Sequence, residues 1–142
     1  MKFIIAAVLL IPQLLLAEPV QGLLGRWKSE NVLYGNNVEF RLGFNFTANK
    51  TELNVDCTFI HGEHLQASTS SRACYDVNHI FIQETKEVVT NDGYHFCRAT
   101  LAPATWTAYF DGAGKMVLFV PVPYQAQFTL VPDTSAPSVP LL

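Results

Sequence analysis

The chain has 142 residues, of which 49% are hydrophobic and 15% are charged, and its formal net charge at pH 7 is −3. Its four arginines, Arg26, Arg41, Arg72 and Arg98, are scattered and form no basic run. Because binding to the phosphate backbone of a nucleic acid depends on clustered positive charge, we expect no nucleic-acid partner.

Residues 1–17 have the three-part pattern of a secretory signal peptide. Lys2 gives a positive start, residues 3–16 are almost entirely apolar, and Ala17 is the small residue before the cleavage point. The apolar run is shorter than the ~20 residues that a membrane-spanning helix needs. We therefore predict an exported, soluble protein, periplasmic or secreted, with no transmembrane span after cleavage.

Cleavage after Ala17 leaves 125 residues, enough for one domain with a buried core. Loss of Lys2 leaves eight Lys and Arg against twelve Asp and Glu, a net charge of −4. We assign residues 18–131 to this domain. Residues 132–142 contain three prolines and no periodicity, so we predict a disordered tail there.

Beyond Ala17 the chain alternates between apolar and polar residues, the pattern of strands that bury one face. The clearest runs are residues 38–46 and 53–59. Weaker alternation continues through residues 65–72, 80–84, 94–101, 104–110, 116–120 and 124–131. No stretch in this part of the sequence has the 3.6-residue period of an amphipathic helix.

Turn-forming residues separate these runs, as in Tyr34-Gly35-Asn36-Asn37 and Asn91-Asp92-Gly93. About nine short strands joined by tight turns predict an all-β fold. We expect a small antiparallel up-and-down β-barrel of eight to nine strands, because closure removes the exposed edges of a sheet. A two-sheet β-sandwich is the alternative.

Gly25-Arg26-Trp27 lies at the start of the first expected strand. Such a tryptophan can close one end of a small barrel, and the glycine allows a close approach of the chain. We therefore expect structural roles for Gly25 and Trp27, with Trp27 more buried than Trp106. Together with Cys57 and residues 70–75 and 92–97, the tripeptide resembles the short exported lipocalin-like domains of bacteria. The resemblance implies a lipocalin-like barrel.

Three cysteines in an oxidising compartment predict one disulfide and one free thiol. Cys57 and Cys97 lie within expected strands, whose fixed geometry can hold a bridge, and the lipocalin-like resemblance implies the same pair. We predict a Cys57–Cys97 bond with both sulfur atoms pointing inward, which requires a narrow barrel at that level. Cys74 is then the free thiol, either reactive or simply a small half-buried side chain.

His61, Glu63 and His64 cluster in one expected hairpin loop. Zinc needs three or four ligands held by a second shell, so we expect a solvated turn, with no metal and no cofactor. Nothing in the sequence resembles a nucleophile turn, a phosphate loop or paired carboxylates, and we expect no enzyme. Asn45 and Asn49 begin glycosylation sequons, which matter only in a host that glycosylates.

Aromatic residues are spread over most of the expected strands, and in a small barrel they either fill the interior or line a slot for an apolar ligand. Their number favours a mostly filled interior.

Two functions stay open: an exported barrel that binds a small apolar ligand at its open end, or a filled, non-enzymatic barrel that binds or inhibits a protein through its loops. A cavity above about 300 Å³ would favour the first, and an exposed apolar patch on the loops the second. We expect a monomer. The candidate ligand-lining residues are Phe40, Phe44, Phe59, Trp106 and Phe128.

Overall fold

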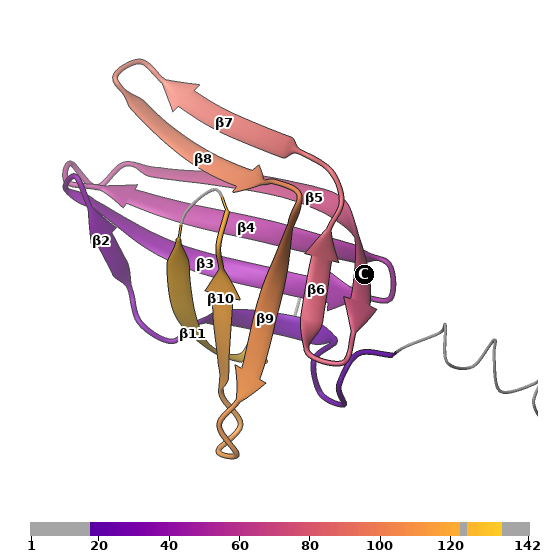
Figure 1. Ribbon diagram of the computed structural model, residues 1–142. Coiled ribbons are helices and arrows are strands. Elements are labelled where there is room, and N and C mark those ends of the chain that lie inside the picture. Colours follow the sequence, from indigo (N-terminus) through magenta and orange to yellow (C-terminus); the bar gives the residue numbers. More distant parts are fainter. Residues whose placement is uncertain (1–17, 123–124, 135–142) are drawn as a thin grey trace, which may run out of the picture.

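The computed structural model describes residues 18–122 and 125–134 (Figure 1). The predicted signal peptide and most of the predicted tail lie outside the described residues and stay predictions. Among the residues that the structure describes, no helix is long and apolar enough to cross a membrane.

Eleven strands make up the described chain, as the alternation of buried and exposed residues predicts for most of them. They are β1 (Gly25–Ser29), β2 (Leu33–Gly35), β3 (Val38–Thr47), β4 (Lys50–Phe59), β5 (His64–Asp76), β6 (His79–Ile82), β7 (Lys86–Asp92), β8 (His95–Leu101), β9 (Ala104–Phe110), β10 (Met116–Val120) and β11 (Ala126–Pro132).

Eight of these strands form a closed antiparallel barrel in the order β1-β11-β10-β9-β6-β5-β4-β3. The barrel closes through β1, where Trp27 lies opposite Phe44 of β3 on one side and Pro132 of β11 on the other. Strand β2 adds to the free edge of β3 as a short extra strand. The structure thus confirms the predicted all-β barrel of eight to nine strands.

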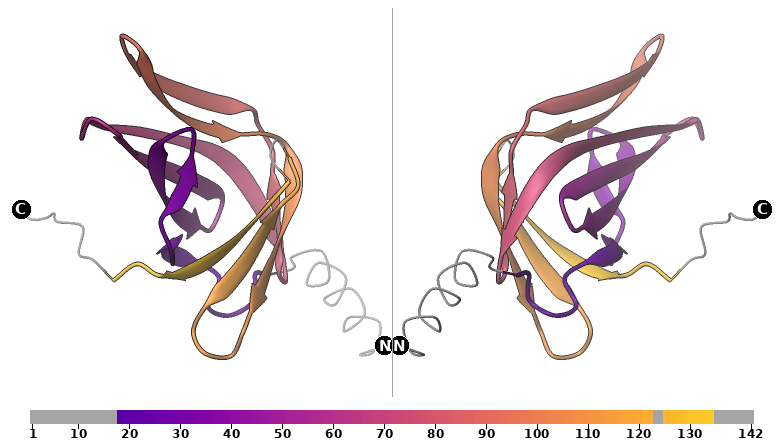
Figure 2. Two further views of the ribbon diagram at one scale, coloured as in Figure 1. Left: turned by 90° about the vertical axis from the view of Figure 1, so that its left-hand side faces the viewer. Right: turned by 90° about the vertical axis from the view of Figure 1, so that its right-hand side faces the viewer.

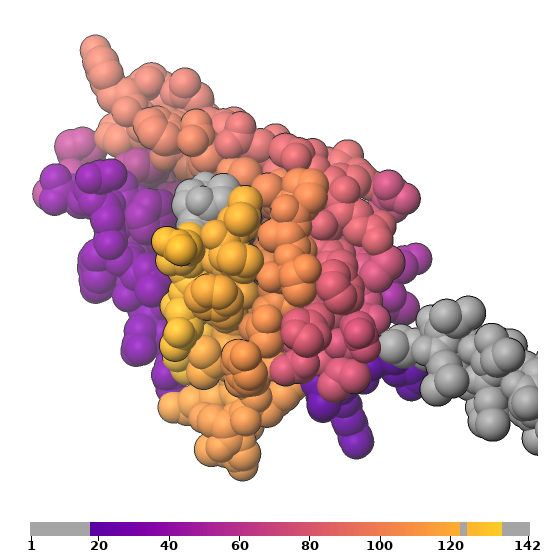
Figure 3. All heavy atoms as spheres, in the orientation of Figure 1, coloured from indigo at the N-terminus to yellow at the C-terminus, as the bar shows by residue number. Residues whose placement is uncertain are grey.

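Strands β7 and β8 form a separate two-stranded hairpin, inserted between barrel neighbours β6 and β9. In Figures 1 and 2 the hairpin rises from the barrel and extends over β4 and β5. The space-filling view shows its side chains lying against the strands beneath it (Figure 3). The alternation predicts residues 94–101 as a barrel strand, whereas the structure places them in this hairpin.

The N-terminal segment crosses one end of the barrel before β1 begins. It is held by hydrogen bonds with Val77, and its residue Leu23 is completely buried. Trp27 packs at this end, and its indole Nε1 donates to the carbonyl oxygen of Leu23 at 3.0 Å. Trp27 is 6% exposed and Trp106 only 2%, so the expectation that Trp27 is the more buried tryptophan is wrong. Trp106 lies on β9, opposite Ile80 of β6.

Gly25 has a structural role for a different reason from the one we expected. Its φ is +129°, in the region that side-chain-bearing residues rarely adopt, and an added Cβ would meet no atom within 4 Å. The backbone conformation therefore calls for glycine at this position, and close approach of the chain does not.

Candidate functional site

A half-enclosed apolar cavity of about 330 Å³ lies inside the barrel beside the hairpin. Strand β8 supplies one wall, and strands β2, β3, β4, β9, β10 and β11 supply the rest. Ten of the twelve lining residues are apolar, and the two polar ones both come from β8. The lining residues are Leu33, Phe40, Leu42, Phe44, Leu53, Val55, Phe96, Arg98, Thr100, Trp106, Val120 and Phe128.

Phe44 is the centre of the aromatic wall. Its ring centroid lies 5.9 Å from that of Trp106, edge to face, and 6.2 Å from that of Phe128. These residues come from β3, β9 and β11, so the contact between Phe44 and Trp106 joins opposite sides of the barrel. Period-2 alternation places each of the three rings on the inner face of its strand.

Four of the five candidate ligand-lining residues border this cavity: Phe40, Phe44, Trp106 and Phe128. Phe59 does not. It lies at the end of β4, where it packs against His95 of the hairpin with ring centroids 4.7 Å apart. Sequence reasoning did not single out Phe96, Arg98 or Thr100, because nothing local indicates that β8 borders the barrel interior.

Arg98 and Thr100 form a polar group with Glu87 of β7 at the hairpin wall. The Arg98 Nε lies 3.2 Å from Glu87 Oε2, and the Thr100 hydroxyl donates to the same oxygen at 3.0 Å. The Arg98 guanidinium also lies over the Phe96 ring, 5.6 Å from its centroid. The Arg98 side chain is 48% exposed, so this group stands where the cavity meets solvent.

The Cys57–Cys97 disulfide fastens the hairpin to the barrel. The bond joins β4 to β8 with the two Cα atoms 6.0 Å apart, which confirms the predicted pair, and both cysteines are buried. The bond does not require a narrow barrel, because β8 is not a barrel strand; the hairpin carries Cys97 to β4. Cys74 is free and exposed on β5.

A polar cluster joins the hairpin to the β4–β5 turn. His95 Nδ1 lies 2.8 Å from Glu63 Oε1, and the rings of His95 and His61 are in edge contact at 5.0 Å. The pKa of Glu63 is raised, chiefly because its carboxyl group hydrogen-bonds to that of Asp92. His64 lies apart from this cluster, near Asp56 on β4.

The cluster differs from the grouping seen in the sequence, since His95 and Asp92 of the hairpin join His61 and Glu63 in place of His64. Among residues 18–122 and 125–134, no group of three or more histidine, cysteine, aspartate or glutamate side chains has an arrangement that could hold a metal ion.

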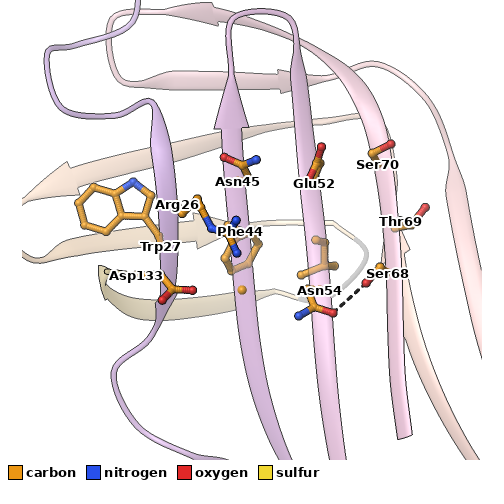
Figure 4. Close-up of a pocket in the computed structure, with 12 residues that line it drawn as sticks. Arg26, Trp27, Phe44, Asn45, Glu52, Asn54, Ser68, Thr69, Ser70 and Asp133 are labelled. Atoms are coloured by element: carbon orange, nitrogen blue, oxygen red, sulfur yellow. Dashed lines mark hydrogen bonds between the residues drawn. The ribbon is translucent and has the colours of Figure 1, made fainter. Parts of the chain in front are cut away.

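A second hollow, of about 310 Å³, lies over β1, β3, β4 and β5 (Figure 4). Its polar lining includes Arg26, Asn45, Glu52 and Ser70, which alternation places on the outer face of the barrel. All four are exposed or half-buried, so this groove is a solvated surface. Asn49, the other sequon residue, is exposed in the β3–β4 turn.

No family model matches the chain, and the searches of curated proteins and of solved structures also return no match. The resemblance to lipocalin-like domains therefore stays a prediction from the sequence. What is established is the closed eight-strand barrel, its disulfide-fastened hairpin and the apolar cavity between them.

Proposed function

We propose that this protein is an exported, non-enzymatic, lipocalin-like barrel that binds a small apolar ligand in the cavity beside β8. The observation that carries the proposal is the cavity itself, about 330 Å³ with ten apolar residues among the twelve that line it. Ligand pockets typically begin at about 300 Å³ and combine mostly apolar walls with a few polar groups.

The disulfide supports the exported part of the proposal. The Cys57–Cys97 bond is buried and joins two separate parts of the fold. Structural disulfides of this kind persist in oxidising compartments and are rare in the cytosol. The predicted signal peptide points to the same route.

An uncharged fluorescent probe, N-phenyl-naphthylamine, tests the proposal without assuming the ligand. We expect it to bind the protein with enhanced emission. Leu42→Trp should abolish binding, because Leu42 lines the cavity and the larger side chain occupies it. Ser70→Trp is the matched control, since Ser70 lines only the outer groove and its replacement should leave binding intact.

Thermal melts of both variants establish that the barrel is folded. Equal probe binding by the two folded variants would contradict a ligand site in the cavity. Absence of binding to the unmodified protein would contradict the proposed function itself.

A second candidate function is protein binding through the loops. Three large apolar side chains, Tyr94, Tyr34 and Ile60, are 99%, 76% and 73% exposed. They come from the β7–β8 turn, from β2 and from the β4–β5 turn, which lie toward the same end of the molecule in Figure 1. Exposed apolar side chains that gather into one patch are typical of interaction sites. The cavity nevertheless favours the first function, because protein binding through the loops is expected of a barrel with a filled interior.

A further inference from the structure

We infer that the ligand is an amphiphile with a carboxylate-type anionic headgroup, bound with its apolar part inside the barrel and its headgroup against Arg98. This inference rests on the proposed function and adds the chemical class of the ligand and its orientation.

The aromatic and the polar residues of the cavity wall come from different parts of the fold. The aromatic side chains of Phe44, Trp106 and Phe128 come from strands of the barrel, whereas both polar lining residues, Arg98 and Thr100, come from β8 of the hairpin. A ligand that is apolar throughout would make no polar contact with the guanidinium at the cavity mouth. A ligand with one polar end can match both parts of the wall, which fixes its orientation.

Among the described residues, Arg98 is the only charged one in the lining. It is paired through Nε with Glu87, which is not part of the lining. A guanidinium has five N–H donors in a planar fork, so pairing through Nε leaves the two terminal nitrogens able to donate to a second acceptor. Arginine binds carboxylates in this two-bonded way with charge-assisted hydrogen bonds.

The neighbours of Arg98 hold it at the cavity mouth. Thr100 donates to the same Glu87 oxygen that the guanidinium meets, and the guanidinium carbon lies over the Phe96 ring on the same face of β8. Both contacts restrict the side chain to the region where the cavity opens. The Arg98–Glu87 pair is itself about half exposed, and such pairs contribute little stability, so a headgroup can share the guanidinium with Glu87.

Charge decides among the possible headgroups. An ammonium group would be repelled by Arg98, and a hydroxyl group would accept only a neutral hydrogen bond. A carboxylate gains a charge-assisted pair, which is roughly twice as strong as its neutral counterpart. We therefore expect selectivity for acids over alcohols and amines of equal chain length.

Displacement of N-phenyl-naphthylamine by decanoate, decanol and decylamine at neutral pH tests this selectivity. We expect decanoate to bind about tenfold more tightly than decanol, and decylamine to bind most weakly. Arg98→Gln should weaken the binding of decanoate about tenfold and leave the affinities for decanol and for the probe unchanged. Glu87→Gln should have the opposite effect and strengthen the binding of decanoate, because it removes the carboxylate that pairs with Arg98.

Arg41→Gln is the matched control, because Arg41 carries the same charge on β3 but does not line the cavity. It should leave all three affinities unchanged. Equal binding of decanoate and decanol, or an Arg98→Gln variant that retains the preference for decanoate, would overturn the inference and leave the proposed function standing. Failure of the probe and of all three compounds to bind would instead overturn the proposed function.

Discussion

The two tryptophans occupy different environments in the barrel. Trp27 packs against Phe110, with ring centroids 6.0 Å apart, and its Nε1 donates to the carbonyl of Leu23. Trp106 is more completely buried, yet its Nε1 has no partner among the described residues. Trp27 therefore belongs to the packing at one end of the barrel, and Trp106 belongs to the wall of the apolar cavity.

We expect Trp27→Ala to lower the free energy of unfolding by about 3–5 kcal/mol, as other replacements of buried aromatic residues by alanine do. Trp27→Phe keeps a ring in place and removes the hydrogen bond to Leu23, so its loss should be close to 1 kcal/mol. Urea unfolding measures both values. A loss below about 1 kcal/mol for the alanine variant would show that Trp27 does not hold the closed end.

Two glycines on neighbouring strands allow a matched test of backbone conformation. Gly25 has a φ of +129°, whereas Gly43 has no positive φ, and its added Cβ would lie in ordinary contact, 3.7 Å from the Cβ of Asn54. Gly25→Ala should destabilise the protein by about 1–3 kcal/mol because alanine is strained there. Gly43→Ala should be neutral or stabilising by up to about 1 kcal/mol. Equal changes in the free energy of unfolding of the two variants, measured with urea, would contradict a conformational requirement for glycine at position 25.

The β7–β8 hairpin is the element on which the proposed site depends. It supplies Phe96, Arg98 and Thr100 to the cavity wall, although it shares no sheet with the barrel. Apart from side-chain packing, it is held by the Cys57–Cys97 bond, by the polar contact of His95 with the β4–β5 turn, and by the Thr90 hydroxyl, which donates to the carbonyl oxygen of Gln66 on β5 at 3.1 Å. Its position therefore depends on one covalent link and on polar contacts at two places.

Removing the disulfide with Cys57→Ala and Cys97→Ala should lower the free energy of unfolding by about 3–4 kcal/mol, the chain-entropy value for a loop of this length. The amides of β7 and β8 should lose protection from hydrogen exchange before those of the barrel strands. Cys74→Ser is the control and should change neither quantity, because Cys74 is free and exposed.

Peptide mapping under non-reducing conditions, with free thiols labelled first, checks the pairing itself. The label should fall on Cys74 alone. Label on Cys57 or Cys97 would contradict the fastening of the hairpin to β4.

The polar cluster predicts that the hairpin tip responds to pH. The pKa of Glu63 is raised, chiefly by its hydrogen bond to Asp92 and further by desolvation, while the charges of His95 and His61 lower it by smaller amounts. A pKa that is higher in the folded state means that the proton stabilises the fold. This stabilisation is complete below the ordinary glutamate pKa and is lost as pH rises through the raised value.

We therefore expect the hydrogen-exchange protection of the hairpin tip, corrected for intrinsic exchange, to fall as pH rises through the raised pKa of Glu63. Glu63→Gln keeps a hydrogen-bonding group beside Asp92 and should remove most of this dependence. Glu52→Gln, in the outer groove, should leave it in place. An unchanged pH profile in the Glu63→Gln variant would contradict the role of the cluster.

At the scale of the whole molecule, the sequence predicted the barrel because each barrel strand buries one face and exposes the other. Strand β4 shows this most plainly, with Thr51, Leu53, Val55, Cys57 and Phe59 buried in alternation with half-buried polar residues. Strand β7 was not predicted, because its residues are exposed or half-exposed and leave no alternation. A strand that buries neither of its faces leaves no alternation to detect.

The same physics explains why the polar part of the site was missed. In β8 the buried residues are Cys97, Ala99 and Leu101, so alternation assigns Arg98 to the solvent side. In the structure that opposite face, with Phe96 and Arg98, borders the cavity. The packing position of a hairpin depends on contacts between distant parts of the chain. Local periodicity does not predict such contacts.

The central claim, that the barrel cavity is a ligand site, is tested most directly by native mass spectrometry of the protein purified from its own host. We expect a species heavier than the chain by the mass of one small molecule, which is released on unfolding. The added mass should persist in Ser70→Trp and be absent from Leu42→Trp, whose new side chain occupies the cavity. An added mass that Leu42→Trp retains, or a protein that carries no added mass and binds no N-phenyl-naphthylamine, would contradict the claim.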